Sequence, residues 1–229
     1  MENKMMQNEI KIINLPLPFW MGSVNCYLIQ AGAGRLLIDT GSSNNRQALV
    51  RELERAGCQP GSLRLIALTH GDFDHTGNAA YLRQAYGGKI AMHPGDAGMA
   101  ERGDMFEGRK KPNRLIRALL PVFSGFGKSK WFKPDLLLED GQDLSEYGLD
   151  ARVISIPGHS LGSIAILTAS GDCFCGDLLE NRKEPTLNSL IDDPVAARAS
   201  LQKLRSMGAS VIYPGHGRPF ALELFQLAS

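Results

Sequence analysis

The chain has few cysteines, no long apolar run and no low-complexity linker. The four cysteines, Cys26, Cys58, Cys173 and Cys175, are irregularly spaced and form no C-x-x-C pair, which argues against a disulfide framework. Cys173 and Cys175 alternate along an expected strand, and we interpret both as small core residues. No apolar run approaches the roughly 20 residues of a membrane-spanning helix, and the polar residues 1–11 do not resemble a signal peptide. We therefore expect a reduced, cytoplasmic protein.

An excess of charge of either sign is also missing. Lysine and arginine total 25 and aspartate and glutamate total 24, which leaves a formal net charge of +1. A balance this even excludes a generally basic nucleic-acid binder, so we expect no nucleic-acid partner. Hydrophobic residues make up 43% of the chain, which excludes a disordered protein. The length of 229 residues fits one large domain, and we predict a single domain over residues 1–229.

The apolar pattern predicts strands interleaved with helices in both halves of the chain. Short runs rich in β-forming residues predict strands at 10–17, 25–30, 35–39, 63–69, 89–92, 136–138, 150–156, 163–169, 173–176 and 211–213. Helical spacing predicts helices at 44–56, 78–86 and 193–208, the last begun by a capping aspartate and a proline. Residues 94–134, with glycine and proline throughout, predict one or two irregular helices. This alternation favours a layered α/β protein.

Side chains that can bind metals follow several of the predicted strands. The densest group lies in the segment THGDFDHTG at residues 69–77, directly after a buried strand. Together with later positions, the candidate ligands are His70, Asp72, Asp74, His75, His159, Asp177 and His216. Ligand sites in α/β sheets gather outside the carboxyl ends of strands, so we expect these side chains to converge. Imidazole nitrogens and carboxylate oxygens are ligands for divalent metals.

The order and spacing of these residues resemble the metallo-β-lactamase fold superfamily. The marker of that family is H-x-H-x-D-H, followed by a later histidine, a later aspartate and a final histidine. The segments NCYLI at 25–29 and LIDTG at 37–41 are similar to the family's opening strands. The resemblance implies an α/β fold, an αββα sandwich of two mixed β-sheets flanked by helices. It also implies a lid-like insertion at about 95–134 and a dinuclear metal site at one edge.

The resemblance further implies how the candidate ligands divide between two metal ions. The first metal would be held by His70, Asp72 and His159. The second metal would be held by Asp74, His75 and His216, and Asp177 would bridge both. A hydroxide between the metals would attack a carbonyl carbon, because a bound divalent ion lowers the pKa of its water toward about 7. Asp74 would also act in catalysis by orienting that hydroxide, and Asp39 and Thr69 are expected to contact and support the ligands.

Asp72 departs from the family pattern, which has histidine at this position. The change replaces a nitrogen ligand with a hard, charged oxygen, which moves the preference from the zinc expected for the family toward iron or manganese. Di-iron flavoproteins of the superfamily carry a glutamate there, so the sequence also fits an iron redox protein, although this chain has no room for their separate flavin domain. Two more interpretations stay open: Asp72 does not bind and the first site is weak or empty, or the fold serves as a non-catalytic metal or ligand sensor.

Two further departures narrow the expected substrate. Glyoxalase II-like thioesterases use a C-terminal helical region to hold glutathione, whereas only residues 217–229 follow His216 here, so we do not expect glutathione thioester hydrolysis. Homoserine lactonases of the superfamily place a tyrosine three residues after the bridging aspartate, where this sequence has Glu180. The leading interpretation is a metal-dependent hydrolase of an ester, thioester or lactone, in the glyoxalase II and lactonase-like branch.

A basic and aromatic segment occupies residues 109–133. It contains eight lysines and arginines and no acidic residue, and it lies where superfamily members insert elements that cover the substrate. Three interpretations are open for it. The segment is a lid that binds a small anionic or amphiphilic acyl substrate, a membrane-surface or partner-docking element, or a solvated face whose apolar side packs on the domain.

Overall fold

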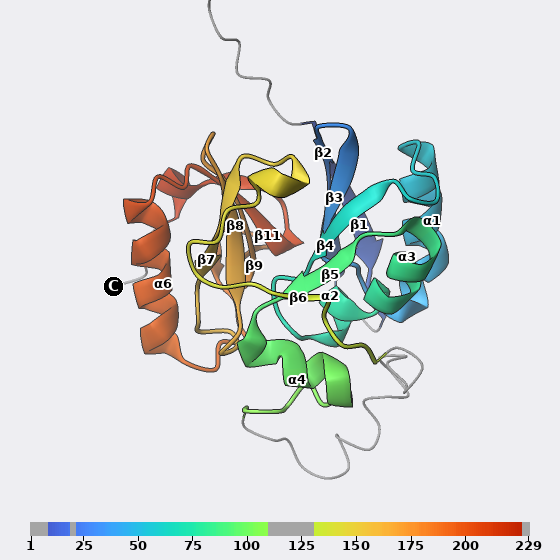
Figure 1. Cartoon of the computed structure of the whole chain (residues 1–229). Coiled ribbons are helices and arrows are strands. Elements are labelled where there is room, and N and C mark those ends of the chain that lie inside the picture. The colour runs from blue at the N-terminus through green and yellow to red at the C-terminus, as the bar shows by residue number, and fades with distance from the viewer. Residues whose placement is uncertain (1–8, 19–21, 110–130, 226–229) are drawn as a thin grey trace, which may run out of the picture.

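Two β-sheets pack face to face, and helices cover both outer faces of the sandwich (Figure 1). The computed structural model describes residues 9–18, 22–109 and 131–225. Helices α1 and α3 lie on the outer side of one sheet and α6 lies on the outer side of the other, while α4 lies across one end (Figure 1). This arrangement of four layers confirms the αββα fold class that the sequence predicted.

The first sheet has the strand order β1-β2-β3-β4-β5-β6. Its strands are β1 Ile10–Pro16, β2 Ser23–Ala31, β3 Gly34–Ile38, β4 Leu63–Ala67, β5 Lys89–Met92 and β6 Leu136–Leu137. The first three strands pair antiparallel and the pairs from β3 to β6 are parallel, so the sheet is mixed. Helices α1 (Arg46–Arg55) and α3 (Ala79–Tyr86) bury Leu49, Leu53 and Leu82 against its outer face.

The second sheet has the order β12-β11-β9-β8-β7, with β10 paired to β9. Its strands are β7 Ala151–Ser155, β8 Ile164–Thr168, β9 Asp172–Asn181, β10 Thr186–Leu187, β11 Val211–Gly217 and β12 Phe220–Ala221. Helix α6 (Pro194–Ser206) begins as predicted, because the Asp193 side chain accepts hydrogen bonds from the Val195 and Ala196 amides. Leu201 and Leu204 of α6 pack on the outer face of this sheet.

The inner faces of the two sheets form a third apolar cluster between them. Ile29, Leu36 and Ile38 from the first sheet meet Ile166 and Phe174 from the second. Removing this apolar surface from water is the main force that holds the sheets together. The sandwich therefore brings together, at one end, loops that are far apart in the sequence.

Strands β9 and β11 extend further than the sequence predicted. We expected Asp177 and His216 to follow strands that end at 176 and 213, but both residues lie inside strands. The register between β9 and β11 shifts around Pro214, and Gly176 has a φ of +51°. These irregularities interrupt the alternation by which strands are recognised in a sequence, which is why the predicted strands stop short.

Several short elements escaped prediction as well. They are the four-residue helix α2 (Phe73–Thr76), the strands β10 and β12, and the 3-10 turns at Ser43–Asn45, Ser145–Tyr147 and Leu222–Leu224. Elements this short carry too few residues for a recognisable period. Among the described residues, no helix combines the length and the apolar content that crossing a bilayer would need.

The predicted insertion at 95–134 begins with a regular helix. Helix α4 (Pro94–Arg102) is capped by the His93 side chain, which accepts a hydrogen bond from the Gly95 amide. Met99 and Ala100 of α4 are buried, and the Phe132 amide donates to the Ala100 carbonyl. The described part of this segment is therefore packed onto the sandwich. Residues 110–130, which make up most of the basic segment, lie outside the described residues.

Candidate metal centre

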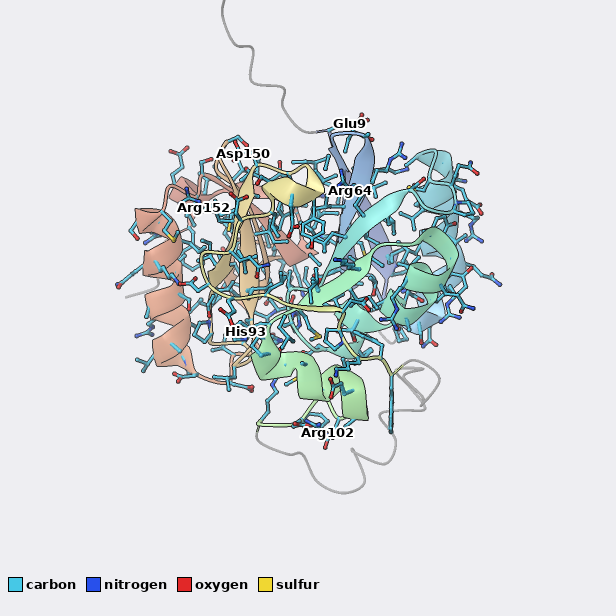
Figure 2. All side chains as sticks on the ribbon, viewed as in Figure 1. Glu9, Arg64, His93, Arg102, Asp150 and Arg152 are labelled. Atoms are coloured by element: carbon cyan, nitrogen blue, oxygen red, sulfur yellow. The ribbon has the colours of Figure 1, made fainter. Side chains whose placement is uncertain are left out.

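The candidate ligands gather at the end of the sandwich that carries α4. His70 and Asp72 lie in the loop after β4, and Asp74 and His75 lie on α2. The others are His159, in the β7–β8 loop, Asp177 on β9 and His216 on β11. Figure 2 shows His93, after β5, at this end of the molecule, and Glu9, Arg64 and Asp150 at the opposite end. Both sheets thus contribute side chains to one place.

The first ligand group consists of His70, Asp72 and His159. The Asp72 Oδ2 atom lies 3.0 Å from His159 Nε2 and 3.6 Å from His70 Nε2. The rings of His70 and His159 are 4.7 Å apart between centroids and nearly perpendicular. Ligand atoms of the two histidines and of Asp177 all lie within 4.8 Å of one another, a spacing that could hold one metal ion.

The second ligand group consists of Asp74, His75 and His216, whose ligand atoms also lie within 4.8 Å of one another. Asp177 lies between the groups: its Oδ1 is 3.3 Å from His75 Nε2 and its Oδ2 is 3.1 Å from His216 Nε2. The His70 and His75 rings are only 4.1 Å apart between centroids. All seven predicted ligands are therefore neighbours in one cluster.

One buried carboxylate, Asp39, orients a histidine of each ligand group. His75 Nδ1 lies 2.8 Å from Asp39 Oδ2 and donates its proton to it. The Thr69 hydroxyl donates to the same oxygen at 2.8 Å, which leaves its own oxygen to accept from His70 Nδ1 at 3.0 Å. With both Nδ1 atoms donating to these oxygens, the Nε2 atoms of His70 and His75 face the cluster. Asp39 and Thr69 thus contact the candidate ligands His75 and His70.

The two remaining histidines are held differently. His216 Nδ1 donates to the Ser23 carbonyl at 2.7 Å, and Asn25 of β2 donates to the Pro214 and Gly217 carbonyls on either side of His216. In the part of the chain that the structure describes, His159 Nδ1 is buried and makes no hydrogen bond. The His159 ring is therefore the one ligand ring in the cluster with no hydrogen bond from its outer nitrogen to a described residue.

The cluster shifts the pKa values of its own members. Burial alone would raise the pKa of Asp177, but the His216 and His75 rings hold that pKa well below its usual value. Burial would likewise lower the pKa of His75, and the Asp177 and Asp39 carboxylates instead raise it well above its usual value. The pKa of His216 is raised in the same way, mainly by Asp177 against the effect of burial. Opposite charges at this distance favour both charged forms.

Buried polar atoms in the cluster show that these residues fit metal ions. His70 Nε2, His75 Nε2 and Asp177 Oδ1 are buried and make no hydrogen bond with the described residues. A buried polar atom without a partner is costly, so a group of such atoms pointing at one place needs an explanation. Imidazole nitrogens and carboxylate oxygens are the donor set of zinc, iron and manganese, and cations bound at the two ligand groups would give all three atoms a partner.

The comparisons with known proteins agree with this geometry. The family model described as the metallo-beta-lactamase superfamily matches residues 20–216. The chain belongs to this superfamily. It is 32% identical over 205 residues to the rat "Metallo-beta-lactamase domain-containing protein 1", and the match covers 87% of this chain and 68% of that protein. It therefore spans about two thirds of the length of that relative.

Two further superfamily members are informative. The bovine "Acyl-coenzyme A thioesterase MBLAC2" is 28% identical, over 90% of this chain and 77% of that protein. The solved structure described as "TTHA1623 in a di-iron-bound form" is 30% identical, has a TM-score of 0.65, and matches 92% of this chain and 96% of its own. The resemblance read from the sequence is thus confirmed at the level of the superfamily.

In the protein described here by its own structure, Asp72 forms an ion pair with Arg109. One guanidinium nitrogen lies 2.6 Å from Asp72 Oδ1, the oxygen that does not face the histidines. The guanidinium also donates to the His159 carbonyl at 2.7 Å and pairs with Asp192. The same nitrogen that contacts the carbonyl is 3.5 Å from His159 Nε2. Arg109 is therefore a cation at the edge of the first ligand group.

The Asp72–Arg109 contact was not predicted, although Arg109 is the first residue of the basic segment. Nothing in the local pattern distinguishes Arg109 from the other basic residues nearby. Asp96, which is buried and contacts the loops of the first ligand group, was also missed. Asp96 lies in the segment for which irregular helices were predicted. Acidic side chains are common in the first turn of a helix, so nothing in the sequence marked Asp96 as a functional residue.

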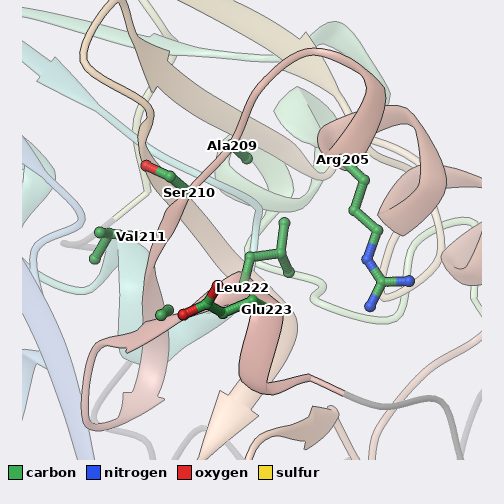
Figure 3. A pocket seen from close by; sticks show the side chains of 7 residues that line it. Arg205, Ala209, Ser210, Val211, Leu222 and Glu223 are labelled. Carbon is green, nitrogen blue, oxygen red and sulfur yellow. The ribbon is translucent and has the colours of Figure 1, made fainter.

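Other candidate groups lie away from the centre. Cys173 and Cys175 are both buried in the apolar cluster under α6, and burial raises the pKa of Cys175 to about 12. A pocket of about 540 Å³ lies near the C-terminus, and Figure 3 shows the side chains that line it. It is lined by the start of β11 and contains Arg205 and Glu223 but none of the candidate ligands. We infer no reaction at that pocket.

Proposed function

We propose that the protein is a metal-dependent hydrolase that cleaves an acyl ester or thioester with the help of two divalent ions. The observation that carries this proposal is the pair of ligand groups that meet at Asp177, with unpaired buried atoms aimed between them. When bound, two divalent ions there would supply the Lewis acidity that activates water and polarises a carbonyl. His70, Asp72 and His159 would hold one ion, Asp74, His75 and His216 the other, and Asp177 both.

The side chains of the centre set the direction from which a substrate enters. The three ligand carboxylates keep 6–8% of their surface exposed, whereas the four ligand histidines keep 0–3%. All seven side chains are therefore buried, and the carboxylates are slightly more exposed than the rings. An acyl carbonyl would approach over Asp74, whose Oδ2 lies 3.5 Å from His216 Nε2. We assign Asp74 the task of holding the attacking water and accepting its proton.

Asp39 holds two of the ligand rings in the orientation that metal binding needs. It accepts the Nδ1 proton of His75 directly and orients His70 through Thr69, so both rings keep their Nε2 lone pairs toward the ions. Without this carboxylate, either ring could take the other tautomer and present an N–H to the ion. Asp39 thus supports the reaction without touching a substrate.

Two features favour an acyl thioester or ester over a lactone. Glu180 lies beside His216 in the β9–β11 register, is buried and pairs with Arg182, so this position offers a carboxylate rather than a phenol that could donate to an oxyanion. The bovine relative is named an acyl-coenzyme A thioesterase. The basic residues that follow Arg109 in the sequence would attract an anionic acyl substrate. Membrane-surface contact by residues 109–133 stays a prediction.

The identity of the metal ions is also part of the proposal, because the donor atoms of the centre suit more than one metal. Zinc is expected for the superfamily, whereas the carboxylate of Asp72 favours iron or manganese. The relative solved in a di-iron-bound form supports iron. We propose that Asp72 binds through Oδ2, because that oxygen faces His70 and His159 while Arg109 holds Oδ1.

The test is a metal titration coupled to a substrate panel. The metal-free protein is loaded with zinc, iron(II) or manganese, bound metal is counted, and release of acid is followed with esters, thioesters and lactones. We expect two equivalents of metal and turnover of esters or thioesters, lost in Asp74→Ala. Arg102→Gln, which removes an exposed ion pair with Glu107, serves as the matched control and should retain turnover. Absence of turnover on every acyl substrate with two metals bound would overturn the proposal.

A second candidate function is iron-dependent redox chemistry. The carboxylate at Asp72 and the di-iron-bound relative favour it. It requires oxygen consumption by the iron-loaded protein with an added electron donor, and no acid release from acyl substrates. A protein that binds metal and shows neither activity would fit a sensor.

A further inference from the structure

Helix α4 carries a buried carboxylate that touches both loops of the first ligand group. Asp96 has no exposed surface and lies in the first turn of α4. Its Oδ2 accepts a hydrogen bond from the Gly71 amide at 2.9 Å and another from the Ser160 hydroxyl at 2.6 Å. Its Oδ1 accepts from the Gly162 amide at 2.8 Å. One carboxylate therefore joins the β4–α2 loop to the β7–β8 loop.

The partners of Asp96 lie next to the ligands themselves. Gly71 stands between His70 and Asp72, and Ser160 directly follows His159. Each ligand of the first group is thus one residue away from a hydrogen bond to Asp96. None of these bonds involves the second group, whose residues lie on α2 and β11. Asp96 therefore makes its direct contacts with one half of the centre.

Asp96 and Gly162 are closely packed where α4 meets the β7–β8 loop. A Cβ on Gly162 would lie 2.5 Å from the Asp96 amide nitrogen and 2.6 Å from its carboxylate carbon, distances that no real side chain tolerates. The Ser160 hydroxyl is itself fixed, because it also contacts the Ser163 hydroxyl at 2.7 Å. Two amides and a hydroxyl that converge on a buried carboxylate form charge-assisted bonds, which are stronger than neutral ones. The β7–β8 loop is therefore held tightly against α4.

The His159 ring needs such support more than the other rings. The outer nitrogens of His70, His75 and His216 each contact Thr69, Asp39 or the Ser23 carbonyl. His159 Nδ1 has no such contact among the described residues, so no hydrogen bond from that nitrogen orients the ring. Apart from the contact of its Nε2 with Asp72, the ring is positioned through its own backbone, which Asp96 holds at the next residue and Arg109 holds at the His159 carbonyl. A ligand that is poorly positioned binds its ion weakly.

We propose that Asp96 is a positioning residue for the first metal half, which fixes His159, His70 and Asp72 through their loops and so sets the affinity of that half alone. The inference rests on the proposed metal centre. It assigns to α4, at the start of the predicted insertion, a role in assembling the ion site. Asp39 and Asp96 then divide the work: Asp39 orients rings of both groups, and Asp96 aligns the two loops of the first group.

The first experiment measures metal binding to variants of the full chain. Wild type, Asp96→Asn, Asp96→Ala and Ser160→Ala are titrated with zinc and with manganese by equilibrium dialysis. Asp135→Asn is the control, because Asp135 also accepts a backbone amide, that of Ile90, but contacts neither ligand loop. We expect Asp96→Ala to weaken one of the two equivalents by about 10- to 100-fold, the usual effect of losing a partner that orients a ligand. Asp96→Asn and Ser160→Ala should weaken it less, and Asp135→Asn should not change it.

Double variants identify which half is affected. Added to His159→Ala, which disables the first group, Asp96→Ala should cause no further loss of metal. Added to His216→Ala, it should remove the remaining tight ion. Equal weakening of both equivalents by Asp96→Ala, or no weakening of either, would overturn the proposal. Thermal unfolding of Asp96→Asn, in which two of the three hydrogen bonds can persist, separates the local effect from a folding defect.

A second measurement decides the inference without any metal. Hydrogen exchange in the metal-free protein should show faster exchange of the Gly71 and Gly162 amides in Asp96→Ala and unchanged exchange at His75 and on β11. Unchanged protection of those two amides would show that Asp96 does not hold the loops. If wild type binds no metal while the exchange pattern changes as expected, the proposed function fails and the loop positioning by Asp96 stands.

Discussion

The two halves of the proposed metal centre differ in how their histidines are held. In the second ligand group, the protein orients the rings themselves: Asp39 holds His75 and the Ser23 carbonyl holds His216. In the first group, His159 is held through its backbone by Asp96 and Arg109, and Asp72 is paired with the Arg109 cation. A ring fixed by its own hydrogen bond keeps its tautomer and direction, whereas a ring carried by a loop moves with the loop. We therefore expect the second half to bind its ion more tightly than the first.

The difference also follows from where the residues lie. The second group lies on a helix and a strand, α2 and β11, and the first group lies in two loops that belong to different sheets. Loops depend on specific hydrogen bonds for their position because they lack a repeating ladder. A site with one firm half and one adjustable half has a place where affinity can be tuned without disturbing the rest.

The largest effect is expected from removing the residue that the two halves share. Oδ1 of Asp177 contacts His75 and Oδ2 contacts His216, and Asp177→Asn removes this carboxylate. Both equivalents of metal should bind weakly, and hydrolysis should fall by about 1,000-fold, since each tenfold loss of rate corresponds to about 1.4 kcal/mol and metal activation supplies several. Metal counting and acid release check this. Retention of one tight equivalent would show that Asp177 belongs to a single half.

The next largest effect is expected at Asp39. Asp39→Asn removes the acceptor that fixes the tautomers of His75 and, through Thr69, of His70. Both ions should bind about 10- to 100-fold more weakly, in contrast to Asp96→Ala, which should weaken one. Equilibrium dialysis of the two variants side by side gives the comparison. If Asp39→Asn weakened the binding of only one metal equivalent, the contact through Thr69 would not contribute to the orientation of His70.

Acidification should separate the halves as well. Burial would lower the pKa of His75, but Asp177 and Asp39 raise it well above its usual value, and the pKa values of His216 and His159 are also raised by their carboxylate neighbours. In the metal-free protein, these pairs stabilise the fold fully below pH of about 6.5, and the stabilisation is lost as the pH rises through the raised values. A metal ion must displace the protons, so its apparent affinity should fall as the pH falls.

Isothermal titration in two buffers with different ionisation enthalpies measures the protons released. His159→Ala, which leaves the second half with His75 and His216, should release more protons for each ion than His216→Ala. Equal release of zero protons at pH 7 in both variants would show that the histidines are neutral before the metal binds.

A smaller effect, confined to the first half, is expected at Arg109. Its guanidinium contacts Asp72 and lies 3.5 Å from His159 Nε2, so it repels a cation bound there. Arg109→Gln should tighten binding of the first ion by about tenfold, because the repulsion in this nearly buried place outweighs one lost hydrogen bond. Arg102→Gln, in the same segment, is the control. Weaker binding in Arg109→Gln would instead mean that Arg109 mainly positions Asp72.

Much of this centre could be predicted from the sequence. Four candidate ligands are recognisable because they stand in the dense segment at residues 69–77, whereas the later ligands, His159, Asp177 and His216, are recognisable only through the order and spacing that the superfamily shares. The strand boundaries at Asp177 and His216 were wrong, because Gly176 and Pro214 interrupt the regular alternation. Asp96 and Arg109 were missed as participants, because their partners lie 25 to 83 residues away in the chain.

The sequence by itself was enough to predict the fold class and the candidate ligands, because the order and spacing of its histidines and aspartates resemble those of the superfamily. The tertiary structure alone decided which atoms hold those ligands in place. Asp96 reaches Gly71 and Gly162 only because the two sheets pack against each other and α4 closes one end of the sandwich. A hydrogen bond depends on the positions of atoms to within tenths of an ångström, and those positions are settled by packing between distant segments.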